Sequence, residues 1–181
     1  TTTAKKDGDD YILNGEKIFV TAGERGNAVV VWATLDKEKG KAAIKSFVVK
    51  HGTPGMEVTR VEKKLGIRAS DTAAIQFTDC RVPAANLLGS PEIDQKKGFG
   101  GVMQTFDNTR PLVGAMSLGC ASAALEKTKE LLKEALDLEN FKTPQNNLNS
   151  AEQAYYRLEA DYEAARLLVL RATWMADNLS L

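Results

Sequence analysis

Residues 2–21 read TTAKKDGDDYILNGEKIFVT, and this stretch decides the fold class. Short runs that contain apolar residues are interrupted twice, by Asp7-Gly8 and by Asn14-Gly15. Asp-Gly and Asn-Gly are the strongest hairpin signals, because both central residues of a type I′ turn need a positive φ. The pattern therefore predicts two hairpins and three short strands, over residues 2–6, 11–13 and 16–21.

The β-rich pattern continues to Pro83. Further runs rich in β-branched and aromatic residues are Ala28–Leu35, Ile44–Lys50, Met56–Val61 and Ala73–Val82. Their connections, such as DKEKGK and HGTPG, are rich in charged residues and turn formers. Seven short strands at close spacing predict an antiparallel β-barrel or sandwich.

The hydrophobic period becomes helical from Gly98. Leu118, Leu125 and Leu132 lie on one stripe, which predicts a helix from about residue 100 to 136. We expect this helix to be interrupted or kinked at Pro111, because the proline ring clashes with the preceding turn.

A second helix is predicted after the polar stretch 137–150. Ser150 and Gln153 form a capping box at its start. Apolar residues then recur three or four apart, at Tyr155, Leu158, Tyr162, Ala165, Val169, Ala172, Ala176 and Leu179. This seam predicts an antiparallel partner helix and further apolar surface for helices that the chain lacks. The expected fold class is α+β, with a β-domain over residues 1–95 and a helical domain over 96–181.

Composition excludes several classes of protein. The 181 residues include 24 Lys plus Arg and 24 Asp plus Glu, so the basic field of a nucleic-acid-binding protein is absent. No apolar run reaches the length of roughly 18 residues that a membrane span needs. The N-terminus has neither Met nor an apolar signal segment, so we expect an internal fragment of a longer protein. We interpret Cys80 and Cys120 as buried, reduced thiols rather than a disulfide.

Classical catalytic templates do not fit. His51 lies in a turn without Cys, Asp or Glu at ligand spacing, so we expect no metal site and no catalytic triad. Two local patterns remain. Ile18 and Val20 are expected on one face of their strand, and Phe19 and Thr21 on the other. An aromatic ring, a hydroxyl group and a free backbone N–H at the sheet rim could bind a planar heterocycle. An ordinary cross-strand aromatic residue with a neighbouring Thr is the competing interpretation.

The second pattern is FDNTRP, residues 106–111. Asp107 and Arg110 are three residues apart and therefore share a helical face. Arg110 could hold a carbonyl or phosphate group of a ligand. A surface ion pair is the competing interpretation.

In order along the chain, these segments resemble the acyl-CoA dehydrogenase family. The resemblance is carried by DDYILNGEKIFVTAG (9–23), KKLGIRASDTAAIQFTDCRVPAANLLG (63–89), GFGGVMQTFDNTRPLVGAMSLGCASAALE (98–126) and, more weakly, AARLLVLRATWMADN (164–178). The family fold has a middle β-domain followed by a helical C-terminal domain. The resemblance implies a flavoprotein that binds FAD and oxidises an acyl-CoA thioester.

The resemblance also implies roles for individual residues. Phe19 occupies the place where relatives carry a Trp against the isoalloxazine ring, and Thr21 matches the Thr that hydrogen-bonds the flavin near N5. Phe106, Asp107 and Arg110 match residues that line the acyl-CoA site. Arg68, Ser70 and Thr72 match a signature loop, to which we assign a mainly structural role.

In this family a carboxylate removes the α-proton while N5 of the flavin accepts hydride from the β-carbon. The base of most relatives is a Glu that we expect outside this chain. A few relatives carry it on the first long helix, where this chain has Thr109. No catalytic residue is therefore expected within residues 1–181, and the fragment itself is expected to be inactive.

The resemblance further implies an electron-transferring flavoprotein as electron acceptor and a homo- or hetero-oligomer. It places the protein in the bacterial cytoplasm or the mitochondrial matrix. Leu138 and Lys142 depart from the family's flavin-contacting interface motif. Two alternatives therefore stay open: an acyl-CoA oxidase or flavin monooxygenase of the same superfamily, and a non-catalytic partner subunit of a hetero-oligomeric dehydrogenase.

Overall fold

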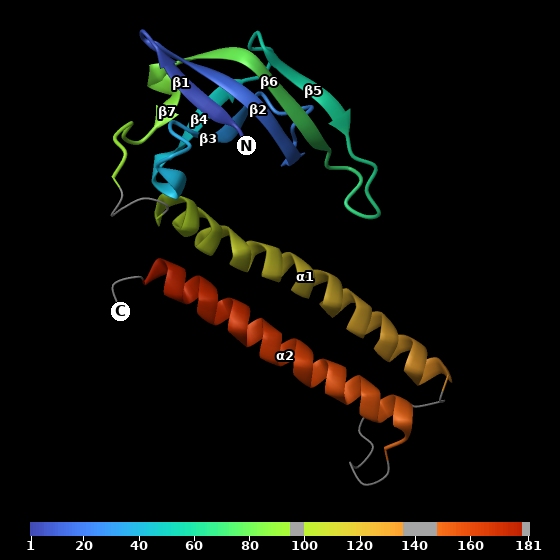
Figure 1. Ribbon diagram of the computed structural model, residues 1–181. Coiled ribbons are helices and arrows are strands. Elements are labelled where there is room, and N and C mark those ends of the chain that lie inside the picture. Colours follow the sequence, from blue (N-terminus) through green and yellow to red (C-terminus); the bar gives the residue numbers. More distant parts are fainter. Residues whose placement is uncertain (95–99, 136–147, 179–181) are drawn as a thin grey trace. The chain divides into compact units, whose positions relative to one another are not determined.

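The computed structural model describes residues 1–94, 100–135 and 148–178 of the chain (Figure 1). The chain divides into two compact units. We call Thr1–Gly100 the β-unit and Gly101–Leu181 the helical unit, and each is described by itself.

One curled sheet forms the β-unit. Its strands lie in the order β5 (Met56–Val61), β6 (Thr72–Pro83), β2 (Asp10–Thr21), β1 (Thr3–Asp7), β3 (Ala28–Thr34), β4 (Ile44–Lys50) and β7 (Leu87–Leu88). Two short 3-10 helices, Gly40–Ala43 and Ala84–Asn86, lie in its connections.

The sheet is mixed and open, which corrects the expected antiparallel barrel or sandwich. β3 pairs with β1 in parallel, through Thr3 and Thr34. Both β1 and β3 run antiparallel to β2. Because β3 lies next to β1 in the sheet, the two strands that meet there are parallel. No pairing between β5 and β7 occurs among the described residues, so the sheet does not close.

The first predicted hairpin is confirmed and the second is wrong. β1 and β2 pair as far as Asp7 and Asp10. At Asn14-Gly15, however, β2 continues without a turn. The register along β6 moves from Leu13↔Cys80 to Gly15↔Phe77, so β6 carries the extra residue of a β-bulge.

Long-range contacts explain why Asn14-Gly15 does not turn. The Asn14 side chain donates to Oδ1 of Asp79 at 3.0 Å and accepts the Asp79 backbone N–H at 2.9 Å. Gly15 has φ +134°, and a Cβ at this position would lie 2.7 Å from Cα of Thr2. Asn14 thus binds the bulged residue Asp79 of β6, and Gly15 allows the close approach of Thr2, because glycine tolerates a positive φ and has no Cβ.

The core lies on one face of β1, β2, β3, β4 and β6. It contains Ala4, Tyr11, Leu13, Val29, Val31, Ala33, Phe47, Val49, Ile75, Phe77, Cys80 and Val82. The rings of Tyr11 and Phe47 meet edge to face with their centroids 5.1 Å apart. Both cysteines are free thiols. Cys80 is buried as expected, whereas Cys120 is exposed, contrary to expectation.

The helical unit consists of α1 (Gly100–Ala135) and α2 (Ser150–Asp177), which run antiparallel side by side (Figure 1). The helix α1 continues through Pro111, so it is not interrupted there, and a kink at Pro111 stays a prediction. The N-cap of α2 is Asn149, not Ser150. Asn149 and Glu152 exchange two side-chain-to-backbone hydrogen bonds of 2.9 Å, which form the capping box one residue earlier than predicted.

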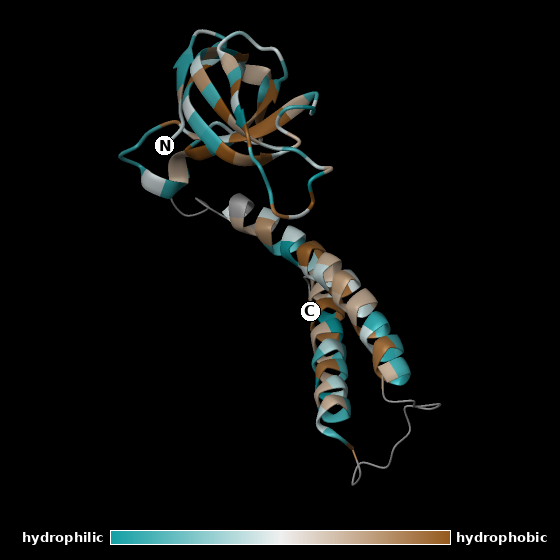
Figure 2. Cartoon of the chain, turned by 90° about the vertical axis from the view of Figure 1, so that its right-hand side faces the viewer, coloured by the Kyte–Doolittle hydropathy of each residue, from teal (hydrophilic) through white to brown (hydrophobic). Residues whose placement is uncertain are grey.

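Only part of the predicted seam on α2 faces α1. Tyr155 is buried, and Tyr162, Val169 and Ala176 are half-buried. Leu158 and Ala165 of the same seam are exposed, as is Ala172, and Leu179 lies outside the described residues. Figure 2 shows hydrophobic, brown segments along both helices. Large apolar side chains remain exposed on them: Met103, Phe106, Leu112, Val113, Met116, Leu131, Leu158, Leu167, Leu168, Leu170, Trp174 and Met175. Neither helix contains a stretch apolar enough, within the described residues, to cross a membrane.

Candidate functional site

The end of β2 forms a rim with an unusual backbone. The register along β6 moves from Lys17↔Ile75 to Val20↔Ala73, so β2 carries one extra residue here. Phe19 lies in this bulge with φ +57°, and its side chain is 66% exposed. A bulky residue in the left-handed region is an outlier, and such residues cluster at functional sites.

The bulge changes which side chains share a face. Val20 packs against the core, whereas Ile18 is 54% exposed, so the predicted common face of Ile18 and Val20 is wrong. Simple alternation fails because the extra residue rotates the strand. Phe19 and Thr21 are both exposed, as predicted for the rim. Lys17 before the bulge is half-buried, and burial lowers the pKa of its ammonium group.

The turn after Thr21 is tied to the loop before β6. The N–H of Ala22 donates to the backbone oxygen of Asp71 at 3.0 Å, and the N–H of Gly23 donates to the oxygen of Val20 at 3.2 Å. The N–H of Glu24 donates to Oδ2 of Asp71 at 2.9 Å. The backbone N–H groups of Ala22 and Gly23, which directly follow Thr21, are therefore occupied rather than free.

The loop between β5 and β6 lies at the same end of the sheet as the rim (Figure 1). Leu65 is fully exposed, and Ile67 is 69% exposed with φ +50°. The signature-loop residue Arg68 is exposed, Ser70 is half-buried, and Thr72 pairs with Thr21 in the ladder. The exposed apolar side chains of Phe19, Leu65 and Ile67 and the exposed Thr21 therefore lie on two segments at the same end of the sheet.

The second predicted set lies on one turn of α1. Nη1 of Arg110 is 3.5 Å from Oδ1 of Asp107, and Cζ of Arg110 is 5.6 Å from the ring centroid of Phe106. Both charged side chains are about two-thirds exposed, so the pair stabilises the helix by less than about 1 kcal/mol. The hydroxyl of Thr109 donates to the backbone oxygen of Thr105 at 3.0 Å. The side chains of Phe106, Asp107 and Arg110 therefore form one contiguous polar and aromatic patch.

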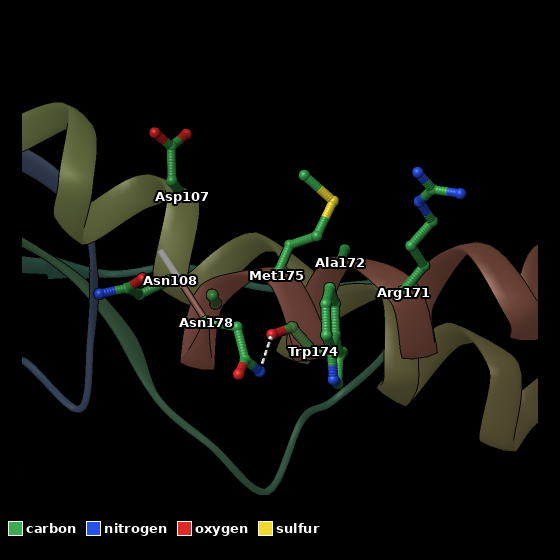
Figure 3. A pocket seen from close by; sticks show the side chains of 8 residues that line it. Asp107, Asn108, Arg171, Ala172, Trp174, Met175 and Asn178 are labelled. Carbon is green, nitrogen blue, oxygen red and sulfur yellow. Dashed lines mark hydrogen bonds between the residues drawn. The ribbon is translucent and has the colours of Figure 1, made fainter. Parts of the chain in front are cut away.

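A cleft of about 600 Å³ in the helical unit was not predicted. It lies between the first turns of α1 and the end of α2, and it is lined by Asp107, Asn108, Arg171, Ala172, Trp174, Met175, Ala176 and Asn178. Figure 3 shows the Asn178 side chain bound to the backbone oxygen of Trp174, at 2.8 Å. Arg171 and Trp174 of the cleft lie off the apolar seam of α2. This departure from the seam is the feature of the sequence that could have indicated the cleft. Within the described residues, no three His, Cys, Asp or Glu side chains group as metal ligands.

Comparison with known proteins identifies the family. The model of the acyl-CoA dehydrogenase middle domain matches residues 1–80, and that of the acyl-CoA dehydrogenase C-terminal domain matches residues 96–180. The rat mitochondrial short-chain specific acyl-CoA dehydrogenase (Rattus norvegicus) is 38% identical over 178 residues, which are 98% of this chain and 42% of that protein.

Solved structures share the fold. Butyryl-CoA dehydrogenase from Megasphaera elsdenii matches with a TM-score of 0.83 and 38% identity, over 97% of this chain and 44% of that one. A structure determined for the electron transferring flavoprotein of Acidaminococcus fermentans matches with a TM-score of 0.82 and 37% identity, again over 97% and 44%. The chain therefore spans about two fifths of the length of these relatives.

A seven-stranded sheet followed by a pair of long helices is thus an arrangement that this chain shares with solved acyl-CoA dehydrogenase structures. The chain belongs to the acyl-CoA dehydrogenase family. Its two units correspond to the middle and C-terminal domains of that family. The departures at Leu138 and Lys142 lie outside the described residues.

Proposed function

We propose that the protein that contains this chain is an FAD-dependent acyl-CoA dehydrogenase, which oxidises the α,β bond of an acyl-CoA thioester. The observation that carries this proposal is Phe19, an exposed aromatic residue in a strained bulge beside Thr21, in a chain of this family. FAD, when bound, supplies the acceptor for the hydride that leaves the β-carbon.

The rim residues fit a flavin ring. The exposed ring of Phe19 offers a flat apolar face for stacking against the isoalloxazine. The exposed hydroxyl of Thr21 can donate a hydrogen bond near N5 of the flavin. The chain thereby orients the ring and shields part of it from water.

The patch on α1 supports substrate binding. Arg110 presents a guanidinium group, which suits the carbonyl or phosphate oxygens of an acyl-CoA. Asp107 and Phe106 hold this group along the helix through the ion pair and the ring contact. Several of the relatives carry names of short-chain enzymes, so short acyl groups are the first substrates to test.

The base that removes the α-proton is not Thr109. A threonine hydroxyl is too weak a base to remove an α-proton, and the hydroxyl of Thr109 donates to the backbone of its own helix. We place the base, a Glu, outside residues 1–181. We also propose an electron-transferring flavoprotein as acceptor and an oligomeric assembly.

Spectroscopy tests the proposal on the protein expressed from its complete gene. We expect a bound flavin with its visible absorption bands, which bleach when butyryl-CoA is added without oxygen and return when electron-transferring flavoprotein is added. A colourless protein without affinity for added FAD would overturn the proposal. Rapid oxygen consumption during turnover would instead indicate an oxidase, and bound flavin that no acyl-CoA bleaches would indicate a non-catalytic subunit.

A further inference from the structure

We propose that Asp71 is a positioning residue, which holds the rim formed by Phe19 and Thr21 in the conformation that receives the flavin. That the ligand is a flavin rests on the proposed function. That Asp71 holds the rim rests on the structure alone. Asp71 accepts hydrogen bonds from two residues of the turn after β2, through its backbone oxygen from Ala22 and through its carboxylate from Glu24. We call these two bonds the Asp71 clamp.

The clamp joins two strained segments. Among the described residues, four non-glycine residues have a positive φ, and three of them, Phe19, Ala22 and Ile67, lie on the segments that the clamp connects. Such conformations persist only where the surrounding structure enforces them. The rim therefore depends on contacts with the loop before β6 to keep its shape.

Packing fixes the turn from below. Gly23 is buried, and a Cβ at this position would lie 2.9 Å from Cβ of Ala73. The turn thus rests directly on β6 and cannot move closer to it. The turn can therefore move only away from the sheet. The hydrogen bond that the N–H of Glu24 donates to the Asp71 carboxylate opposes that movement.

The carboxylate of Asp71 accepts a hydrogen bond from Glu24, which the backbone oxygen of Asp71 does not reach. The β2–β6 ladder ends at Thr21↔Thr72, and the bond from Ala22 to the Asp71 backbone would form with any residue at position 71. The bond from the N–H of Glu24 needs a side-chain acceptor of this length. This bond links β2 to the loop before β6 at a point three residues beyond Thr21, where the main-chain ladder between β2 and β6 has already ended.

Three variants test the proposal. Asp71→Ala removes the bond to Glu24, Asp71→Asn keeps an acceptor oxygen, and Asp36→Ala is the matched control. Asp36 is also half-buried, and its carboxylate accepts the N–H of Glu38 at 2.9 Å in a different loop. The control therefore removes the same kind of bond from the same unit.

We expect Asp71→Ala to weaken FAD binding roughly ten- to 150-fold, the effect of losing one hydrogen bond to a charged group, with an altered visible flavin spectrum. Asp71→Asn should stay within about threefold of the wild type because the bond can still form, and Asp36→Ala should leave FAD affinity and spectrum unchanged. Unchanged FAD binding in Asp71→Ala would overturn the proposal, and so would an Asn variant as weak as the Ala variant.

Hydrogen exchange separates this inference from the proposed function. In the chain without cofactor, Asp71→Ala should accelerate exchange at the amides of residues 19–24, whereas Asp36→Ala should not. If the wild type fails to bind FAD but this difference appears, the proposed function fails and the clamp stands. Equal exchange in both variants would overturn the clamp whatever the cofactor result.

Discussion

Phe19 combines two properties that a purely structural residue rarely has. Its side chain is 66% exposed, so little burial compensates for its left-handed backbone, which costs roughly 1–2 kcal/mol. The neighbouring Ile18 is also exposed but has no positive φ. This contrast within one bulge allows stability and ligand binding to be separated by mutation.

We predict that Phe19→Gly raises the free energy of unfolding by about 1 kcal/mol, because glycine adopts a positive φ without strain. The same change should weaken FAD binding, since the stacking ring is lost. Ile18→Gly is the control and should lower stability by about 0.5–1 kcal/mol. Urea unfolding and FAD titration measure both quantities. A loss of stability in Phe19→Gly would contradict the strain at position 19, and an unchanged FAD affinity would contradict the stacking role of the ring.

At the scale of elements, two capping signals one residue apart competed for the start of α2. Ser150 and Gln153 have the spacing of a capping box, but Asn149 and Glu152 have it too, one residue earlier, and the structure uses the latter pair. Asn accepts from the N3 amide at least as well as Ser does. Glu152 is also buried within the helical unit, so the true cap combines local bonding with packing.

We predict that Asn149→Ala destabilises α2 by about 1 kcal/mol, because the amide of Glu152 loses its acceptor. Ser150→Ala, one residue further, should change stability by less than about 0.5 kcal/mol, since an exposed first-turn position tolerates Ala. Thermal unfolding followed by the helical circular dichroism signal compares the two. Equal losses in both variants would contradict the assigned cap.

At the scale of the whole chain, the two units differ in how much they bury. The β-unit encloses an apolar core contributed by five strands. In the described part of the helical unit, the buried residues are Glu152 and Tyr155, and many large apolar side chains remain exposed. Helical stability in proteins comes mostly from packing an apolar face, so this unit is the weaker one.

We predict that amides of α1 and α2 exchange with solvent at least about tenfold faster than those of β2 and β6 in the 181-residue chain. The physical reason is that opening the helices exposes little additional apolar surface. Hydrogen exchange with mass spectrometry measures this directly. Equal protection of helices and core strands would show that the two helices form a cooperative unit without further partners.

The sequence alone determined the order of a β-unit and a helical unit, the bounds of strands at Ile44–Lys50 and Met56–Val61, and the family. The order of the units and the bounds of these strands depend on local period and turn chemistry, whereas the family was implied by the resemblance of several motifs in order along the chain. Only the tertiary structure decided that Asn14-Gly15 lies opposite a bulge instead of forming a turn, that the sheet is mixed and open, and that Phe19 is strained. In each case the deciding contact comes from a distant strand: Asp79 for Asn14, β1 for β3, and β6 for Phe19. Neighbouring residues cannot specify such contacts, because a pleated strand accepts several registers until its partner selects one.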